Sequence, residues 1–108
     1  MIGDAEEISR VAPAIEAITA RFDIPVSVDT YKPAVAEAAL KSGAHMVNDI
    51  WGLQYAADTQ HTMAQVIAKY DAACCLMHNQ EQPVYQAFLP DCIAFLQKST
   101  ELALAFGI

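Results

Sequence analysis

Basic residues are scarce in this sequence, and their scarcity excludes several classes of partner. Six Lys and Arg stand against 13 Asp and Glu, which gives a formal net charge of −7. A chain this acidic repels nucleic acid and anionic lipid, so we expect neither a nucleic acid nor a membrane as its partner. A local site for a small anion remains compatible with this charge.

The sequence also lacks long apolar runs and a cysteine framework. No run reaches the ~18 apolar residues of a membrane span, and no basic stretch with an apolar block follows Met1, so we expect no secretory signal. Cys74 and Cys75 are adjacent, and Cys92 stands alone. Neighbouring residues of a strand point to opposite faces, so these thiols predict no disulfide and a reduced, cytoplasmic protein. Spaced Cys and His pairs are missing, which excludes a zinc site.

Short apolar segments alternate with helical patterns along the chain. Strands are predicted at residues 24–28, 44–47 and 72–77, where the runs are short and apolar. Helices are predicted at about 4–22, 33–41, 59–70 and 90–106, with Pro33 starting the second, Asp58 or Thr59 capping the third, and the fourth beginning at Pro90 or Asp91. Apolar strands that alternate with helices form a parallel sheet covered by helices.

This order predicts an α/β fold, α-βα-βα-βα with three parallel strands, in one domain covering residues 1–108. A (β/α)8 barrel of about 250 residues spends about 31 residues on each unit, so we interpret the chain as a partial (β/α)8 TIM barrel. A small doubly wound sheet is the alternative. Against it, no glycine-rich turn follows the first strand.

Polar side chains stand at the ends of all three predicted strands. Asp29 follows the first, Asn48 and Asp49 the second, and His78 the third. Because ligands of parallel α/β folds bind at the carboxyl ends of the strands, we expect these side chains near one site. Helix and turn capping is the structural alternative, and two oxygen ligands with one nitrogen also suit a divalent metal. The set contains no nucleophile and no phosphate-binding glycine loop.

Four motifs resemble the dihydropteroate synthase family. Residues 25–31 resemble the family's "SVDT" strand, and residues 35–44 resemble the "VAEAAL…GA" helix that follows it. Residues 47–50 resemble "INDI", and residues 76–79 resemble "LMH". Each motif is short, but all four stand in the right order and spacing over essentially the whole chain. The chain therefore resembles an internal piece of such a synthase.

The resemblance implies an activity and a set of site residues. The family condenses 6-hydroxymethyl-7,8-dihydropterin pyrophosphate with para-aminobenzoate to dihydropteroate and pyrophosphate, a step of folate biosynthesis and the target of sulfonamides. By this resemblance Asp29 and Asn48 hydrogen-bond the pterin, and Ile50 and Met77 flank its ring. Such groups suit a pterin's polar edge and flat faces. Asp29 is also expected to be catalytic, by stabilising a cationic pterin as pyrophosphate leaves.

Other expectations concern the rim of the site and what the chain lacks. Asp49 and His78 are expected at the rim, with Asp49 facing either the pocket or the helix layer, and a structural role is favoured for His78 over general-base work. The resemblance implies Mg²⁺ for the whole family, held outside this chain, so no metal ligand is assigned and the chain alone is expected to be inactive. Open barrel edges predict a homo-oligomer.

Two other functions are also compatible with the sequence. One is a methyltetrahydrofolate-dependent methyltransferase of the same pterin-binding barrel group, and the other is a non-catalytic module that only oligomerises. The "VAEAAL…GA" and "LMH" motifs favour the synthase over the methyltransferase. Saturable pterin binding separates both enzymes from the non-catalytic module.

Overall fold

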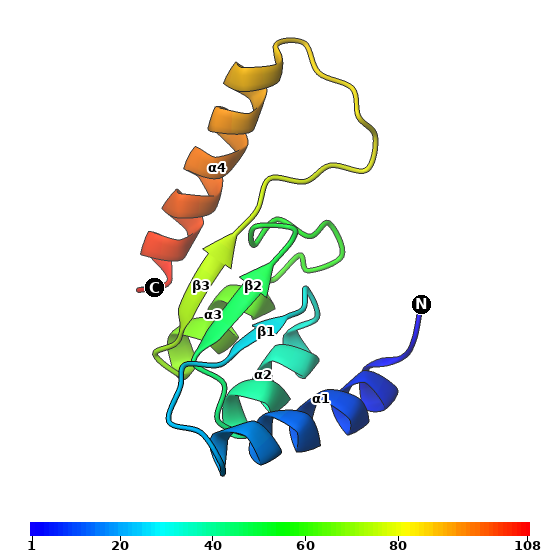
Figure 1. Cartoon of the computed structure of the whole chain (residues 1–108). Helices are drawn as coiled ribbons and strands as arrows, with labels where there is room; N and C mark the ends of the chain where they lie inside the picture. Colours follow the sequence, from blue (N-terminus) through cyan, green and yellow to red (C-terminus); the bar gives the residue numbers. More distant parts are fainter.

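The chain folds into a three-stranded parallel sheet with four helices. This computed structural model describes all residues from 1 to 108. The elements follow in the order α1 (Asp4–Thr19), β1 (Ser27–Asp29), α2 (Pro33–Lys41), β2 (Met46–Asp49), α3 (Thr62–Lys69), β3 (Ala73–Leu76) and α4 (Phe88–Ala105). The strands lie in the order β1-β2-β3, and both pairs are parallel (Figure 1). The predicted α/β order is confirmed.

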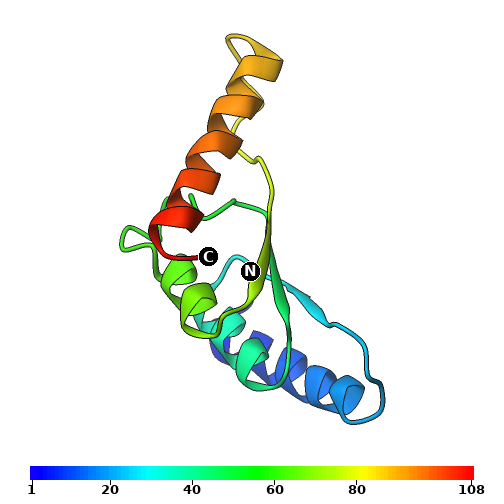
Figure 2. The same cartoon turned by 90° about the vertical axis from the view of Figure 1, so that its left-hand side faces the viewer.

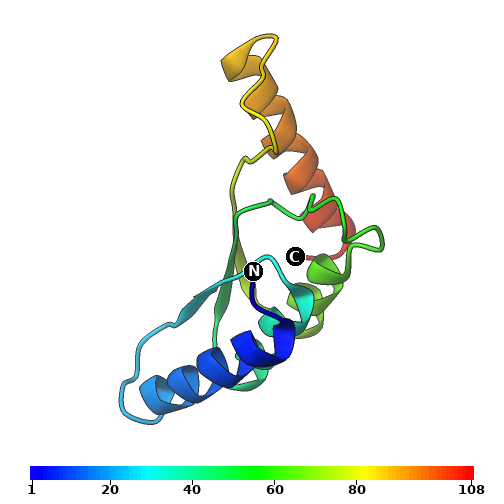
Figure 3. The same cartoon turned by 90° about the vertical axis from the view of Figure 1, so that its right-hand side faces the viewer.

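Helices cover only one face of the sheet. Helices α2 and α3 pack side by side on this face, α1 packs against α2, and the opposite face carries no helix (Figures 2 and 3). Side chains alternate accordingly: Val28 and Val47 are buried toward the helices, while Asp29 is exposed. The residues that alternate with these valines, Ser27 and Asp29 on β1 and Met46 and Asn48 on β2, therefore point to the uncovered face.

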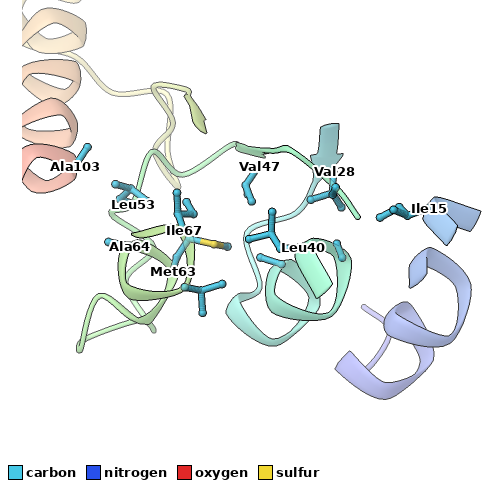
Figure 4. Close-up of a cluster of buried hydrophobic side chains, with 13 residues drawn as sticks. Ile15, Val28, Leu40, Val47, Leu53, Met63, Ala64, Ile67 and Ala103 are labelled. Carbon is cyan, nitrogen blue, oxygen red and sulfur yellow. The ribbon is translucent and has the colours of Figure 1, made fainter. Parts of the chain in front are cut away.

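The hydrophobic core lies between the sheet and helices α2 and α3 (Figure 4). Val35, Val47 and Ile67 expose none of their surface. Helix α3 buries Met63, Val66 and Ile67 because these apolar residues recur at helical spacing on one side. Fully burying an aliphatic side chain stabilises a fold by about 1.5–3 kcal/mol. Packing of this face, more than helix propensity, therefore holds the short α3 in place.

Local signals set the starts of α2 and α3. Pro33 is the first residue of α2, where its missing N–H leaves no hydrogen bond unmade. Helix α3 is capped from upstream by Asp58, whose carboxylate accepts hydrogen bonds from the N–H groups of Thr62 (2.8 Å) and Met63 (2.9 Å). Partial burial disfavours the charge on Asp58, but these bonds outweigh it and lower the pKa of the carboxyl. Of the two predicted caps, Asp58 is the one observed.

Helix α4 begins earlier than predicted, at Phe88. The carboxylate of Asp91 accepts hydrogen bonds from the N–H groups of Gln86 (2.9 Å) and Ala87 (3.2 Å), which draws the helix start upstream. Pro90 is accommodated because the N–H groups of a first turn have no partner within the helix. Neither α4 nor any other helix combines the length and apolar content that crossing a bilayer demands.

Helix α4 rests on the rest of the molecule over a narrow contact. Of its 18 residues only Ser99 and Ala103 are buried. Phe88, Leu89 and Ile93, in its first turns, each expose more than half of their surface. In Figure 1 this part of α4 stands away from the sheet. The helix is therefore attached mainly through its second half.

Candidate functional site

A row of polar side chains crosses the uncovered face at the carboxyl ends of the strands. In the register of the sheet, Asp29 of β1 is paired with Asn48 of β2, and Asn48 with Cys75 of β3. Asp29 and Cys75 are exposed and Asn48 is half-buried. The Nδ2 of Asn48 donates a hydrogen bond to Oδ2 of Asp29 at 3.3 Å. The structure thus brings together two residues that the sequence places at separate strand ends.

This pair offers complementary hydrogen-bonding groups to a ligand. A carboxylate accepts through two oxygens, while an amide both donates and accepts. Together Asp29 and Asn48 match a flat heterocycle whose edge carries donors and acceptors. The negative charge of Asp29 also favours a ligand that gains positive charge during a reaction.

Two apolar side chains follow the strands directly beyond this row. Ile50 comes after β2 and is half-buried, while Met77 comes after β3 and exposes 44% of its surface. The N–H of Met77 donates to the carbonyl of Asp49 at 3.1 Å, so the pairing of the two strands continues past the end of β3. Met77 is therefore held beside the end of β2. An aliphatic side chain and a thioether near a polar pair suit the faces of a planar ring.

Asp49 is buried and faces the helix layer, with 1% of its surface exposed. Its carboxylate accepts hydrogen bonds from the N–H groups of Trp51 (2.9 Å) and Leu53 (2.8 Å). Burial raises the pKa of this carboxyl, while the two N–H bonds oppose the rise. Of the two orientations that the sequence left open, the structure has the one toward the helix layer and not the one at the rim of the pocket, because alternation along β2 turns residue 49 away from the face that Asn48 occupies.

His78 packs among aromatic rings where the chain leaves β3. Its ring centroid lies 5.0 Å from that of Phe95 on α4 and 5.8 Å from that of Tyr85. The side chain is half-buried. These contacts tie the segment after β3 to α4, which supports the structural role favoured for this histidine.

Aromatic and charged side chains occupy the turns that follow β1 and β2. The ring centroid of Tyr55 lies 4.8 Å from that of Tyr31 and 5.8 Å from that of Trp51. The Nζ of Lys32 lies 2.6 Å from the carboxylate of Glu7, a hydrogen bond that raises the pKa of Lys32. This cation therefore holds α1 in place and is not a free partner for an anionic ligand.

The loop after β2 is pressed against β3 and α4. Gly52 has a φ of +54°, and a Cβ there would lie 2.6 Å from the carbonyl oxygen of Met77 and 2.8 Å from Oγ of Ser99. The Nε2 of Gln54 donates to the carbonyl of Phe95 at 2.9 Å and to Oγ of Ser99 at 2.8 Å. None of these contacts was predicted from the sequence. A lone glycine after a strand is the only local signal for them.

Metal ligands are not gathered at this site. No three His, Cys, Asp or Glu side chains lie together in a way that would hold a metal ion. Within the row, the thiol of Cys75 is a soft ligand that does not suit Mg²⁺, which prefers oxygen. The row therefore does not fit the magnesium ion that the family resemblance implies.

Known proteins share both the sequence and the fold of this chain. Its whole length is 45% identical over 108 residues to the dihydropteroate synthase of Clostridium beijerinckii, of which it covers 39%. The structure superimposes on a dihydropteroate synthase of Clostridium difficile, solved in the presence of pteroic acid, with a TM-score of 0.91 at 43% identity, covering 100% of this chain and 40% of that one. For the Yersinia pestis enzyme, solved with a pterine–sulfa conjugate, the TM-score is 0.87 at 38% identity, with coverage of 100% and 40%.

These matches confirm the expected partial barrel and the resemblance. The chain spans about two fifths of the length of the relatives it matches, 39% of the first. The model of a family described as pterin binding enzymes matches residues 1–108. The chain therefore belongs to the family of pterin-binding enzymes.

Proposed function

We propose that this chain, as a partial barrel domain over residues 1–108, forms part of the pterin pocket of a dihydropteroate synthase. The reaction joins 6-hydroxymethyl-7,8-dihydropterin pyrophosphate to para-aminobenzoate and releases pyrophosphate. The observation that carries this proposal is the Asp29–Asn48 pair, 3.3 Å apart on the uncovered face of the sheet. Relatives solved with pteroic acid and with a pterine–sulfa conjugate support a pterin as the ligand. The relatives named above are all dihydropteroate synthases, which favours the synthase over the methyltransferase.

The two polar residues Asp29 and Asn48 and the two apolar residues Ile50 and Met77 have separate tasks in this proposal. Asp29 and Asn48 hydrogen-bond the polar edge of the pterin, with the amide of Asn48 turning from Asp29 to the ligand. Ile50 and Met77 contact the faces of the ring. The row lies on a sheet whose other face is packed against the core, so the backbone positions of its residues are set before the ligand arrives, which lowers the entropic cost of binding.

Asp29 contributes to the chemistry through its charge. As the carbon–oxygen bond to pyrophosphate breaks, the bonding electrons leave with pyrophosphate and the pterin methylene carbon becomes positive. A carboxylate already in place stabilises this charge without reorganisation. The amine of para-aminobenzoate then forms the new carbon–nitrogen bond and loses a proton.

Pyrophosphate and Mg²⁺ are bound, in this proposal, by residues outside the chain. Three of its cations are engaged with carboxylates, since Arg10 pairs with Glu6, Lys32 with Glu7 and Lys69 with Glu37. The relatives are much longer, the chain covering 39% of the first. We therefore expect the chain alone to bind the pterin moiety without turning substrate over.

Calorimetric titration with the dihydropterin pyrophosphate tests the pocket. We expect saturable binding by the chain, weakened about tenfold in Asn48→Ala, because a hydrogen bond to the ligand is lost. Circular dichroism of each variant confirms that it is folded.

The matched control for this titration is Asn79→Ala, the same chemical change on the segment after β3. The Asn79 side chain accepts only the neighbouring N–H of Gln80, at 2.9 Å, so this variant should bind as the parent chain does. Absence of saturable binding in a folded parent chain would contradict the proposal and favour a non-catalytic module.

We also propose that the isolated chain self-associates and that it resides in the cytoplasm. Strands β1 and β3 are the edges of the sheet, and exposed apolar side chains gather on α4, including Phe88, Leu89 and Ile93. Unpaired edges and apolar patches promote association. Light scattering over a concentration series should show a mass that rises above 11.7 kDa. A monodisperse monomer at high concentration would refute the self-association.

The proposed location in the cytoplasm rests on the cysteines. All three are free thiols, which suits a reducing compartment.

A further inference from the structure

Asp49 stands between two residues of the proposed pocket, Asn48 and Ile50, but points to the other side of the sheet. Its carboxylate bonds the N–H of Trp51 at 2.9 Å and thereby closes a tight turn around Ile50. The second oxygen bonds the N–H of Leu53 at 2.8 Å. Two backbone N–H groups of the loop are thus bound by one side chain.

The main chain of Asp49 extends these contacts to the neighbouring strand. Its carbonyl accepts hydrogen bonds from the N–H groups of Gly52 and Met77, both at 3.1 Å. Asp49 therefore binds three consecutive N–H groups of the loop, at Trp51, Gly52 and Leu53, and one at the end of β3. Asn48, Ile50 and Met77, three of the four residues proposed to contact the pterin, are all held next to it.

We propose that Asp49 is a positioning residue of the pterin pocket, which fixes Ile50 and Met77 relative to Asn48 without touching the ligand. This inference rests on the proposed function. The geometry of the loop indicates why a carboxylate is needed: Leu53, buried to 3% exposure, adopts a left-handed φ of +65°. Such a conformation is strained in a residue other than glycine and persists only where surrounding contacts impose it.

The cost of burying Asp49 supports this assignment. A buried carboxylate is unfavourable unless hydrogen bonds replace its water. Burial raises the pKa of Asp49, even against the bonds from Leu53 and Trp51. Neighbouring Val47, on the same face of β2, fills its place with an aliphatic side chain and is fully buried. Unlike an aliphatic residue, Asp49 also fixes the conformation of the loop after β2, through its hydrogen bonds to the N–H groups of Trp51 and Leu53.

Asp58 provides a matched control, because it also binds two backbone N–H groups through its carboxylate, at the start of α3 and away from the row. An amide has one acceptor oxygen, so Asp49→Asn and Asp58→Asn each forfeit one of two bonds. Both variants should be less stable than the parent chain. Only Asp49→Asn should weaken binding of the dihydropterin pyrophosphate, by about tenfold or more, since small misplacements of binding groups are costly.

Asp49→Ser serves as a second variant if Asp49→Asn fails to fold. Its hydroxyl can still close the turn to the N–H of Trp51, but the bond to the N–H of Leu53 is lost, and Asp58→Ser is then its control. Equal affinities for the Asp49 variant and the matching Asp58 variant would overturn the proposal.

Nuclear magnetic resonance of the free chain separates this inference from the proposed function. The side-chain amide of Asn48 and the methyl group of Met77 report the geometry of the proposed pocket without ligand. We expect both signals to shift in Asp49→Asn, or in Asp49→Ser if it replaces that variant, and to stay in place in the matching Asp58 variant. If the parent chain binds no pterin, the proposed function fails, and these shifts alone decide the positioning role: unchanged signals would refute it.

Discussion

Replacing Gly52 with alanine is expected to lower the free energy of unfolding by about 3 kcal/mol. The residue has a φ of +54°, and the new Cβ would lie 2.6 Å from the carbonyl oxygen of Met77. That oxygen belongs to backbone hydrogen-bonded into the sheet end, so the clash is relieved only by moving the loop or β3. Urea unfolding followed by the fluorescence of Trp51, the single tryptophan, measures the change.

Gly107→Ala is the control that separates backbone strain from steric overlap. Gly107 also has a positive φ, +82°, but nothing lies within 4 Å of a Cβ added there. Its substitution should cost about 1 kcal/mol, the strain of a left-handed residue. If both variants lost the same free energy of unfolding, the loop after β2 would have to accommodate a methyl group without strain. That result would contradict the close packing described above.

Replacing Ile67 with alanine is expected to lower the free energy of unfolding by about 3–4 kcal/mol. Ile67 on α3 is fully buried in the hydrophobic core (Figure 4). Truncation removes apolar surface from the core and leaves a cavity that the surrounding strand and helices fill only in part. The same urea titration reports the loss.

Ile93→Ala is the matched control on α4, where Ile93 exposes 56% of its surface. Its effect should stay within about 0.5 kcal/mol, as for most surface substitutions. A loss in Ile67→Ala below about 1 kcal/mol would place the core elsewhere. A large loss of unfolding free energy in Ile93→Ala, measured at a concentration at which the chain self-associates, would locate the contact between copies on α4.

The order of elements was predictable because its signals are local. Pro33 marks the first turn of α2, and the buried face of α3 follows from apolar residues at helical spacing. Strand ends are equally local, since Asp29 and Asn48 each follow short apolar runs. Their meeting across the sheet follows from parallel pairing, and the structure confirms it with register and a hydrogen bond. Contact with a pterin stays a prediction.

Features that depend on contacts between distant segments were beyond local reasoning. The apolar runs of the strands do not reveal which alternate residues face the helices, so the sequence left two orientations open for Asp49, and the structure has the one toward the helix layer. The side chain of Gln54 donates a hydrogen bond to Ser99, which lies 45 residues further along the chain. No pattern in either segment predicts this contact. Helix α4 begins earlier than predicted because the side chain of Asp91 accepts a hydrogen bond from the backbone N–H of Gln86.

The narrow attachment of α4 has a consequence for the order in which the native state opens. Segments held by few buried contacts open with small free energies, while core segments exchange their amide hydrogens only through global unfolding. The first turns of α4 bury no side chain, whereas α2 and α3 enclose the core. In hydrogen–deuterium exchange, residues 88–94 should therefore lose protection first and residues 63–67 last. Gln54 bonds α4 only at Phe95 and Ser99, so fraying of the first turns leaves the loop after β2 and the sheet end with Asp29 and Asn48 intact.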